Sequence, residues 1–328
     1  MTGRVEVSLG LWQDRPPEEV LETARCADES GYPAIWVGEM ATYDAVALAT
    51  AIGTTLERAS LVIGPLAVHV HDPMAIAMAV ASVASLTGRP TGVALGTSSP
   101  TVVEGWHGRP RTRTATTLAE SATIVRGLMV GERSDLDGEM VSSRGYRLRL
   151  QPHPDAELTI AAFGPKAVEV AARHADRMVI NLVSVELARD LVASVRRAAQ
   201  GAGRPAPRTA VWLPTAVDTT RAALDQLRFG VVGYLAAPGY ADMFRRAGFG
   251  SVVDLARQGR HPRAVLEAVP DELLHVVAAI GPVEHVRARI AAYHAAGVDD
   301  VVLVPAATDV DPAGRATLEA VAAGLGVR

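Results

Sequence analysis

The sequence holds a single cysteine, Cys26, and outside Ala-rich helical stretches it has no long apolar run. One cysteine cannot form an internal disulfide, so we expect the chain to work in the reducing cytoplasm. The first apolar residues are interrupted at Asp14, which leaves too short a segment for a signal peptide. A membrane-spanning helix needs about eighteen or more consecutive apolar residues, so we also expect no membrane span.

An excess of charge of one sign is missing as well, because 32 basic residues face 36 acidic ones. Nucleic acids and anionic membrane surfaces bind basic proteins, so neither is an expected partner. Lysine is almost absent, and Lys166 is the single lysine among the basic residues. The GxSxG, P-loop and GxGxxG patterns are also missing, which argues against a serine hydrolase, a nucleotidase and a Rossmann enzyme.

What the sequence does contain is a regular alternation of short β-branched runs and Ala-rich helical stretches, which is typical of parallel βα units. The predicted strands are Val5–Leu11, Ala34–Val37, Leu61–Gly64, Gly92–Leu95, Leu158–Ala162, Arg177–Ile180, Thr209–Val217 and Asp300–Val304. Eight such units in 328 residues favour an α/β fold of the (β/α)8 TIM-barrel type, although a doubly wound open sheet would accept the same alternation. No linker or repeat divides the chain, so we predict one domain over residues 1–328.

Two stretches interrupt this rhythm. Residues 131–150 alternate and carry glycine at both turns, which predicts an inserted hairpin. Residues 230–275 form a helical excursion that is too long for one connection. Inserted segments usually decorate the active-site end of a barrel, so we expect both to lie at its mouth and to form the substrate lid.

Catalytic groups of such a barrel lie in the loops that follow the strands. After the fourth strand, Gly96, Thr97 and Ser98 offer close backbone approach and hydroxyl groups for a ligand, although they are also ordinary turn residues. After the fifth strand, Gly164-Pro165-Lys166 begins a helix whose free N–H groups can hold a phosphate; an exposed lysine without a ligand is the other interpretation. After the third strand, Gly64-Pro65 is a place where a cis peptide can occur, although most X–Pro bonds are trans.

Histidines near the mouth supply candidates for proton transfer. His107 shares a loop with Trp106 and Glu104, so His107 or Glu104 could act as acid or base in a pocket there; alternatively, Trp106 simply packs that loop. The pair His69 and His71 is similar to the metal-binding HxH of amidohydrolase barrels. In amidohydrolases, however, the HxH pair follows the first strand, and further histidines stand at later strand ends. Here the pair follows the third strand without such companions, so we predict no metal site.

Several motifs occur in a characteristic order along nearly the whole chain, most weakly over residues 230–275. They are Gly31-Tyr32-Pro33-Ala34-Ile35-Trp36-Val37-Gly38-Glu39, Val62-Ile63-Gly64-Pro65, His71-Asp72-Pro73, Leu86-Thr87-Gly88-Arg89, Ala94-Leu95-Gly96-Thr97-Ser98, Gly131-Glu132 with Leu136-Asp137-Gly138-Glu139, and Ala162-Phe163-Gly164-Pro165-Lys166-Ala167 with His174-Ala175-Asp176-Arg177. In this order they resemble the luciferase-like superfamily, in particular its coenzyme F420-dependent oxidoreductases. No single motif is decisive, but their order is specific.

The resemblance implies a (β/α)8 barrel that binds a deazaflavin, or FMN in some relatives, at its mouth. It implies that the cofactor ring lies against a bulge after the third strand that often holds a non-prolyl cis peptide. Gly64-Pro65 stands at that position, so we expect a cis bond there. The resemblance also implies that Glu39 hydrogen-bonds the cofactor, that Gly96–Ser98 contact its ring and side chain, and that Gly164–Lys166 hold its phosphate.

Two differences from the family pattern narrow the subgroup that this chain resembles. Relatives that oxidise sugar phosphates resemble this chain less, because they carry a histidine where Met40 stands and a glutamate where Ser99 stands. The pattern is closer to methylenetetrahydromethanopterin-reductase-like members. We therefore predict an F420-dependent oxidoreductase that transfers a hydride between C5 of the deazaflavin and a small organic substrate.

The remaining assignments concern the pocket, the partners and the alternatives. The expected pocket wall is Trp12, Tyr43, His71 and Trp106, with His107 as the proton donor and Glu39 as the second catalytic residue. Family barrels commonly dimerise through helices two and three, so we expect a homodimer in which the stretch Ala75–Ala84 packs closely on a partner, unless its small residues serve only tight packing within the barrel. The alternatives are an FMN-dependent monooxygenase and a non-catalytic barrel that binds a cofactor or a partner subunit.

Overall fold

The computed structural model describes residues 3–237, 239–259 and 261–325. Parallel strands form a closed ring in the order β9-β11-β1-β2-β3-β4-β7-β8, and β8 pairs with β9 to close it. The strands of this ring are β1 Arg4–Ser8, β2 Ala34–Val37, β3 Ser60–Ala67, β4 Thr91–Gly96, β7 Leu158–Ala161, β8 Arg177–Asn181, β9 Arg208–Val217 and β11 Asp300–Pro305. The predicted TIM barrel is therefore confirmed, and the open sheet is wrong.

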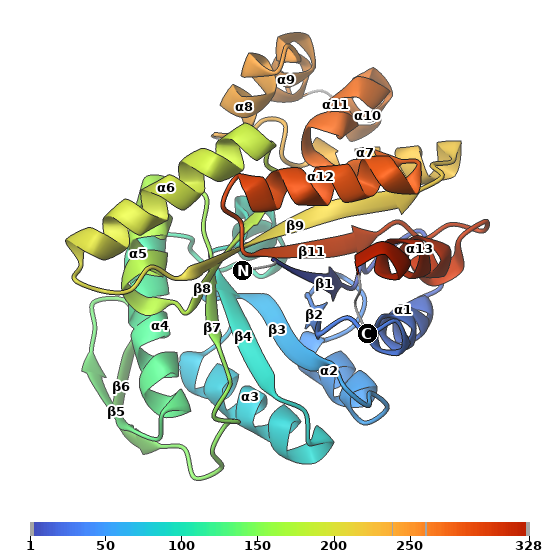
Figure 1. The fold of residues 1–328 in the computed structure, drawn as a ribbon. Helices are drawn as coiled ribbons and strands as arrows, with labels where there is room; N and C mark the ends of the chain where they lie inside the picture. Colours follow the sequence, from blue (N-terminus) through green and yellow to red (C-terminus); the bar gives the residue numbers. More distant parts are fainter. Residues whose placement is uncertain (1–2, 238, 260, 326–328) are drawn as a thin grey trace.

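Helices surround the ring of strands (Figure 1). They are α1 Glu19–Glu29, α2 Ala45–Gly53, α3 Pro73–Thr87, α4 Thr114–Met129, α5 Pro165–His174, α6 Val185–Gly201, α7 Arg221–Val232, α12 Val283–Ala295 and α13 Arg315–Leu325. Local chemistry sets several of their starts: Asp44, Asp72 and Ser184 accept hydrogen bonds from N–H groups in the first turns of α2, α3 and α6. Two short helices are of other types: η1 Thr101–Trp106 is a π-helix and η2 Pro312–Gly314 is a 3-10 helix.

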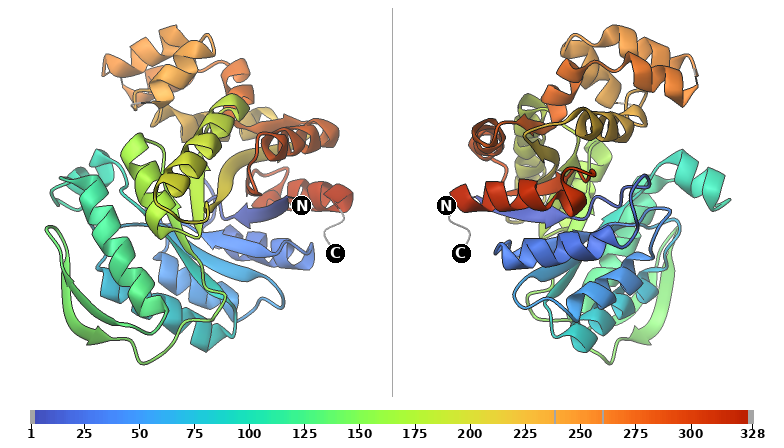
Figure 2. Two further views of the ribbon diagram at one scale, coloured as in Figure 1. Left: turned by 60° about the vertical axis from the view of Figure 1, so that its left-hand side comes forward. Right: turned by 90° about the vertical axis from the view of Figure 1, so that its right-hand side faces the viewer.

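The long segment after α7 forms a group of short helices that stands out from the barrel (Figure 2). These are α8 Tyr240–Arg246, α9 Gly250–Arg257, α10 Pro262–Ala268 and α11 Asp271–Val277. A three-residue strand that the sequence did not reveal, β10 Ala279–Gly281, follows them and pairs with the last residues of β9. Its apolar residues continue directly from α11, so no change of pattern marked it.

The hairpin lies in a different place from the one we expected. Its strands are β5 Arg133–Asp137 and β6 Ser142–Arg147. Instead of covering the mouth, it packs against the outer faces of α3 and α4, where Leu136, Val141 and Tyr146 contact a small cluster. The members of that cluster are Ala77, Ala81, Ile124, Leu128 and Leu148. The apolar side chains of the hairpin therefore cover apolar helix surface, and the prediction that it forms a lid is wrong.

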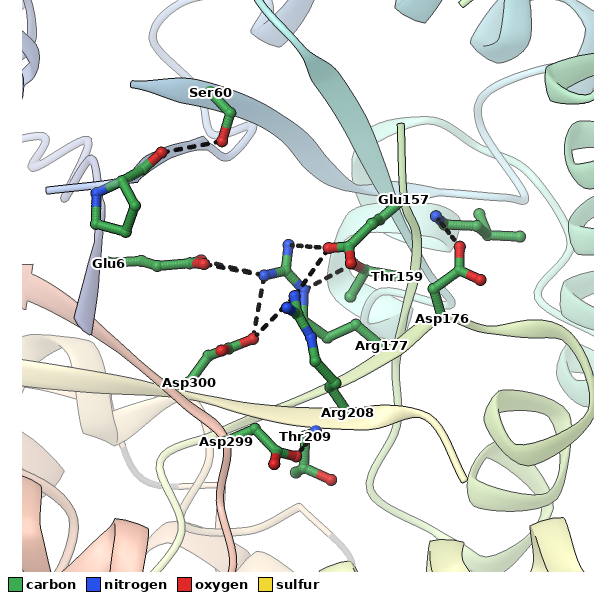
Figure 3. A network of polar contacts seen from close by, with 12 residues as sticks. Glu6, Ser60, Glu157, Thr159, Asp176, Arg177, Arg208, Thr209, Asp299 and Asp300 are labelled. Carbon is green, nitrogen blue, oxygen red and sulfur yellow. Dashed lines mark hydrogen bonds and ion pairs between the residues drawn. The ribbon is translucent and has the colours of Figure 1, made fainter. Parts of the chain in front are cut away.

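A set of charged residues, three of them buried, lies inside the barrel near the beginnings of its strands (Figure 3). We call Glu6, Glu157, Arg177, Arg208 and Asp300 the strand-start network. Arg177 is 2% exposed and reaches Glu6 Oε1 at 3.2 Å and Asp300 Oδ2 at 3.3 Å. Arg208 reaches Glu157 at 2.9 Å and Asp300 at 3.2 Å. Because a buried charge is costly without a partner, this pairing is what allows charges in the barrel interior.

Above this network the interior is apolar. Trp36 lies next to the network, since its Nε1 donates to Glu6 Oε2 at 2.6 Å and the Arg177 guanidinium lies 4.5 Å from its ring centre. The edge of Trp36 meets Trp212, with ring centres 5.9 Å apart. The other buried members of this inner layer are Val62, Ala94, Val179, Ala210 and Val302. The tryptophans thus close the barrel below the loops in which we expect the site.

Candidate functional site

The third strand is distorted where it reaches the mouth. Its pairing with β4 shifts between Ile63 and Leu66, and the Gly64–Pro65 peptide bond is cis, as expected. Gly64 has φ of +108°, and a Cβ there would lie 2.5 Å from Leu66 N and closer still to the carbonyl oxygen of Ala94. Only glycine fits this combination of backbone angle and space, so the bulge is set by the sequence.

The loop after β4 is held in place by an arginine to which we had assigned no role. Arg111 donates from Nε to the carbonyl oxygens of Thr97 at 3.3 Å and Ser98 at 3.1 Å, and from Nη2 to Thr97 Oγ1 at 3.3 Å. Ser98 itself has φ of +52°, so the chain turns sharply there. The signal in the sequence was the run Arg109-Pro110-Arg111-Thr112-Arg113, whose alternating cations lie in a mouth loop.

The fifth helix begins beside that loop. β4 and β7 pair in parallel with Leu95 opposite Ile160, so the residues that follow both strands meet at the same edge. Gly164 precedes α5 without a side-chain cap, Pro165 occupies its first turn, and Lys166 is exposed. The start of α5 therefore presents uncapped N–H groups and a cation to the mouth, which together suit an anion.

The residues after β2 and β3 form a close pair. His71 Nε2 and Glu39 Oε2 lie 2.6 Å apart, with 27% and 29% of their side chains exposed. The hydrogen bond to His71 lowers the pKa of Glu39 despite its partial burial, and the same bond raises the pKa of His71. The pair is therefore most stable as a carboxylate and an imidazolium.

The other predicted pocket residues lie in the segments that follow β1, β2 and β4. Trp12 is fixed by a 2.9 Å hydrogen bond from its Nε1 to the carbonyl oxygen of Pro305. Tyr43 and Trp106 are 38% and 57% exposed, so Trp106 does not pack its loop as the alternative interpretation required. His107 follows η1 at the surface, and its charge contributes to lowering the Glu39 pKa, but no hydrogen bond joins His107 and Glu39.

Two tyrosines of the helical excursion meet Phe163 and Asn181 at the ends of β7 and β8. The ring of Phe163 stacks on that of Tyr240 at 4.0 Å, and Tyr240 donates to the carbonyl oxygen of Asn181 at 2.8 Å. Asn181 Nδ2 in turn donates to the Tyr234 hydroxyl at 3.3 Å. Burial raises the pKa of both tyrosines, which stay neutral. The excursion therefore contacts the mouth at the ends of β7 and β8, where we expected a lid, through tyrosines to which we had assigned no role.

A buried donor lies at the floor of the mouth. Trp212 Nε1 has no hydrogen-bond partner among the described residues. Its ring approaches the space beside Gly38, at the end of β2, where Leu11 is the other neighbour. An N–H group left unpaired in a buried place is costly unless a ligand or water accepts from it. Its position in β9 makes Trp212 a candidate contact that the sequence did not single out.

In the part of the chain that the structure describes, no group of three or more His, Cys, Asp or Glu side chains is arranged to hold a metal ion. None of its helices is both long and apolar enough to cross a membrane.

Comparison with known proteins gives a consistent result. The family model for luciferase-like monooxygenases matches residues 3–300. A Mycobacterium tuberculosis protein (strain ATCC 25618 / H37Rv), provisionally named a coenzyme F420-dependent oxidoreductase, is 28% identical over 92% of this chain and 94% of its own length.

Solved structures share the fold at lower identity. The coenzyme F420-dependent tetrahydromethanopterin reductase of Methanopyrus kandleri superposes with a TM-score of 0.83 at 16% identity, over 97% of both chains. The oxygenating constituent of 3,6-diketocamphane monooxygenase from Pseudomonas putida, in complex with FMN, superposes with a TM-score of 0.70 at 17% identity, over 98% of this chain and 97% of that one.

Proposed function

The chain belongs to the luciferase-like monooxygenase family, and we propose that within it the protein is an F420-dependent oxidoreductase that transfers a hydride to or from a small organic substrate. The observation that carries the choice of cofactor is the similarity over almost the full length to a mycobacterial relative named for F420. The wider family includes FMN enzymes, so FMN is the alternative cofactor that the experiment must separate.

The residues of the mouth fit such a cofactor. The bulge at Gly64-Pro65 brings the ring of Pro65 next to Gly96, and we propose that the planar cofactor ring lies against this floor. Thr97 and Ser98, held by Arg111, lie at the edge of this floor. The uncapped start of α5 at Gly164, Pro165 and Lys166 would hold the phosphate, because it offers N–H donors and a positive charge together.

When bound, the deazaflavin supplies the chemistry by accepting or giving a hydride at its C5. The protein orients the substrate above the exposed ring face and keeps water away. Trp12, Tyr43 and Trp106 would form the substrate wall, and the aromatic group of Phe163, Tyr234 and Tyr240 would cover the site from the side of the excursion.

Titration of the purified chain with F420, FMN and riboflavin tests the proposal. We expect micromolar F420 binding, seen as fluorescence quenching and as a rise in melting temperature, with FMN at least about tenfold weaker. Riboflavin lacks the phosphate, so it should bind more weakly than FMN if α5 holds that group. Selective FMN binding would instead indicate the monooxygenase, and binding of none of the three would contradict a cofactor-dependent enzyme.

We also propose that the protein is a homodimer joined through α2 and α3. Neither helix contains a charged residue, and their outward faces expose Ala47, Ala51, Ala75, Met78 and Leu86. Part of the Ala75–Ala84 stretch serves the fold instead, since Ala77 and Ala81 are buried against α4 and the hairpin. The location in the cytoplasm remains a prediction of the single cysteine.

Sedimentation velocity tests the dimer. We expect a dimer for the wild type and a monomer for Met78→Arg, because a charge would enter an apolar contact. Leu21→Arg on α1 changes a similarly exposed apolar residue, 44% against 50%, and serves as the control. A monomeric wild type, or a Met78→Arg variant that remains a dimer, would rule out this interface.

A further inference from the structure

The pair formed by Glu39 and His71 changes the roles expected from the sequence. The resemblance assigns Glu39 to the cofactor and leaves no titratable group at the next position, where Met40 stands with half of its surface exposed. In the structure, Glu39 Oε2 is taken by His71 at 2.6 Å. The backbone N–H of Ala45 also helps to hold the Glu39 carboxylate in its charged form. Glu39 is thus committed to protein contacts before any ligand arrives.

The position of His71 is suited to proton transfer. It follows β3, just beyond the bulge at Gly64-Pro65, and therefore stands at the edge of the proposed cofactor floor. Its Nε2 faces Glu39, whereas its Nδ1 takes part in no hydrogen bond with a described residue. About a quarter of the side chain is exposed. One ring nitrogen is thus fixed by a carboxylate and the other is available, which is the arrangement of an oriented acid–base histidine.

The charged groups around the pair leave this arrangement intact. Asp44, which precedes α2, favours the protonated form of His71, but its carboxylate caps α2 through Ala47 N at 2.7 Å. Arg109, from the loop after η1, opposes protonation of His71. His107, in the same loop, favours the ionised form of Glu39. These more distant effects are smaller than that of the direct hydrogen bond, which dominates both shifts.

We propose that His71 is the acid–base residue of this site and that Glu39 is the positioning residue that fixes its imidazole. This assignment rests on the proposed function. It replaces His107 as the proton donor and gives Glu39 a role that acts through His71.

Reduction of a polar double bond of the substrate requires one hydride on carbon and one proton on the heteroatom. The hydride would come from the reduced cofactor. His71 supplies the proton from Nδ1, which breaks its N–H bond and leaves a neutral imidazole still bonded to the Glu39 carboxylate. In the opposite direction the neutral imidazole accepts the proton of the alcohol or amine. Solvent water restores the proton balance of His71 between turnovers.

The first experiment measures the pair without any cofactor. Long-range ¹H–¹⁵N spectra of the full chain, labelled on histidine, give the titration of His71, which is assigned by its loss in His71→Asn. We expect a pKa above the ordinary value of about 6.5 in the wild type. Glu39→Gln should bring it down by at least half a unit, whereas His69→Asn, in the same loop, should leave it unchanged. An ordinary or lowered pKa in the wild type, or no response to Glu39→Gln, overturns the proposal.

The second experiment asks whether His71 faces the ligand. Diethylpyrocarbonate modifies accessible histidines, and peptide mapping identifies them. We expect saturating F420, or FMN if that is the cofactor that binds, to slow modification of His71 by at least about fivefold. Equal modification with and without the bound cofactor overturns the proposal. If neither compound binds, the proposed function has failed, and this outcome is distinct from a failure of the pair in the first experiment.

The third experiment uses reduced cofactor with a panel of simple ketones, aldehydes and imines. With any probe that the wild type reduces, we expect His71→Asn to lower kcat by about 100-fold or more with little change in KM, and Glu39→Gln to shift the pH profile to lower pH. A loss of less than about threefold in His71→Asn overturns the proposal. If the wild type reduces none of the probes, the first two experiments decide it.

Discussion

Charged groups are paired with opposite charges at one end of the barrel, whereas the other end leaves a charged group exposed. In the strand-start network every charge lies beside an opposite charge, and Arg177 alone contacts Glu6, Glu157 and Asp300. At the mouth, by contrast, Lys166 is exposed and α5 starts without a side-chain cap. The network serves the fold, whereas these exposed groups of the mouth are available to a ligand.

The cost of this arrangement is visible in the pKa of one member of the network. Burial and the nearby charge of Glu6 raise the pKa of Asp300, although Arg208 and Arg177 act in the opposite direction. The charged form of Asp300 therefore depends on the two arginines. At the mouth, Glu39 shows the reverse, since the hydrogen bond with His71 lowers its pKa. Loss of a partner should thus affect stability at one end and titration at the other.

The largest expected effect comes from breaking the network. Arg177→Met should lower the free energy of unfolding by about 3–5 kcal/mol, because it leaves buried carboxylates without their main partner. Urea unfolding followed by circular dichroism measures this. Arg144→Met, which removes an ion pair with both partners about 70% exposed on the hairpin, should change stability by less than about 0.5 kcal/mol. A small loss in Arg177→Met would mean that the network contributes little to the fold.

An intermediate loss of stability is expected from substitution of Gly64 at the mouth, where the backbone conformation limits which residue fits; Gly88, at the end of α3, is the control. Gly88→Ala places a Cβ at φ of +69° with no atom within 4 Å, so it should cost about 1 kcal/mol for the backbone angle alone. Gly64→Ala adds the contact with Ala94 and should cost about 1–3 kcal/mol more. Thermal and urea unfolding of the two variants measures the cost of the contact with Ala94 as the difference between their stabilities. Equal losses of stability would show that the bulge moves to make room for the added Cβ.

Loss of Gly64 should also affect binding. The bulge forms part of the proposed cofactor floor, so Gly64→Ala should weaken binding of the cofactor, whereas Gly88→Ala, at the end of α3, should not. Fluorescence titration of both variants measures this. Unchanged affinity in a folded Gly64→Ala variant would contradict the placement of the ring against β3.

The smallest effect should come from the exposed lysine. Lys166→Ala should leave stability within about 0.5 kcal/mol of the wild type. It should weaken cofactor binding about threefold to tenfold, because the phosphate loses its attraction to an exposed positive charge that salt screens. The loss should shrink as salt is raised. Arg197 is an exposed cation near the C-terminal end of α6, and Arg197→Ala should change neither stability nor cofactor affinity. Equal affinities for Lys166→Ala and the wild type at low salt would exclude Lys166 as a phosphate contact.

The pH dependence of the His71 pair follows from the direction of its two shifts. The raised pKa of His71 means that its contribution to stability is complete below about 6.5 and is lost as pH rises through the higher folded value. The lowered pKa of Glu39 means that its contribution is present above its ordinary value and is lost as pH falls through the lower folded value. The ion pair is therefore complete between these limits, and both side chains are open enough for only a small effect on stability.

The barrel could be predicted from the sequence because its strands are short apolar runs separated by helical stretches with clear starts. The strand-start network could not, although its signal is visible: Arg177, Arg208 and Asp300 are each the first residue of a strand. Nothing in one strand reveals that closure of the ring brings these charges together. The position of the hairpin was missed for a similar reason, since its apolar side chains fit either a lid or a helix surface.

The candidate site was predictable in its parts but not in its contacts. The glycines of the bulge and the start of α5 stand out by residue type, whereas the pairing of Glu39 with His71 depends on two loops that follow neighbouring strands. Parallel pairing of β2 and β3 places these loops side by side, so adjacency of strands is a usable signal for future sequences. Arg111 and Trp212 were missed because their roles depend on side-chain direction.

The single lysine has a practical consequence for experiments. Amine-reactive dyes modify uncharged amines, and apart from the α-amino group this chain offers them only the ε-amino group of Lys166. Peptide mapping would show how the label is divided between these two amines. A fluorophore can therefore be attached at the start of α5 without any mutation, where its emission would report on ligand entry and on movement of the helices around the mouth.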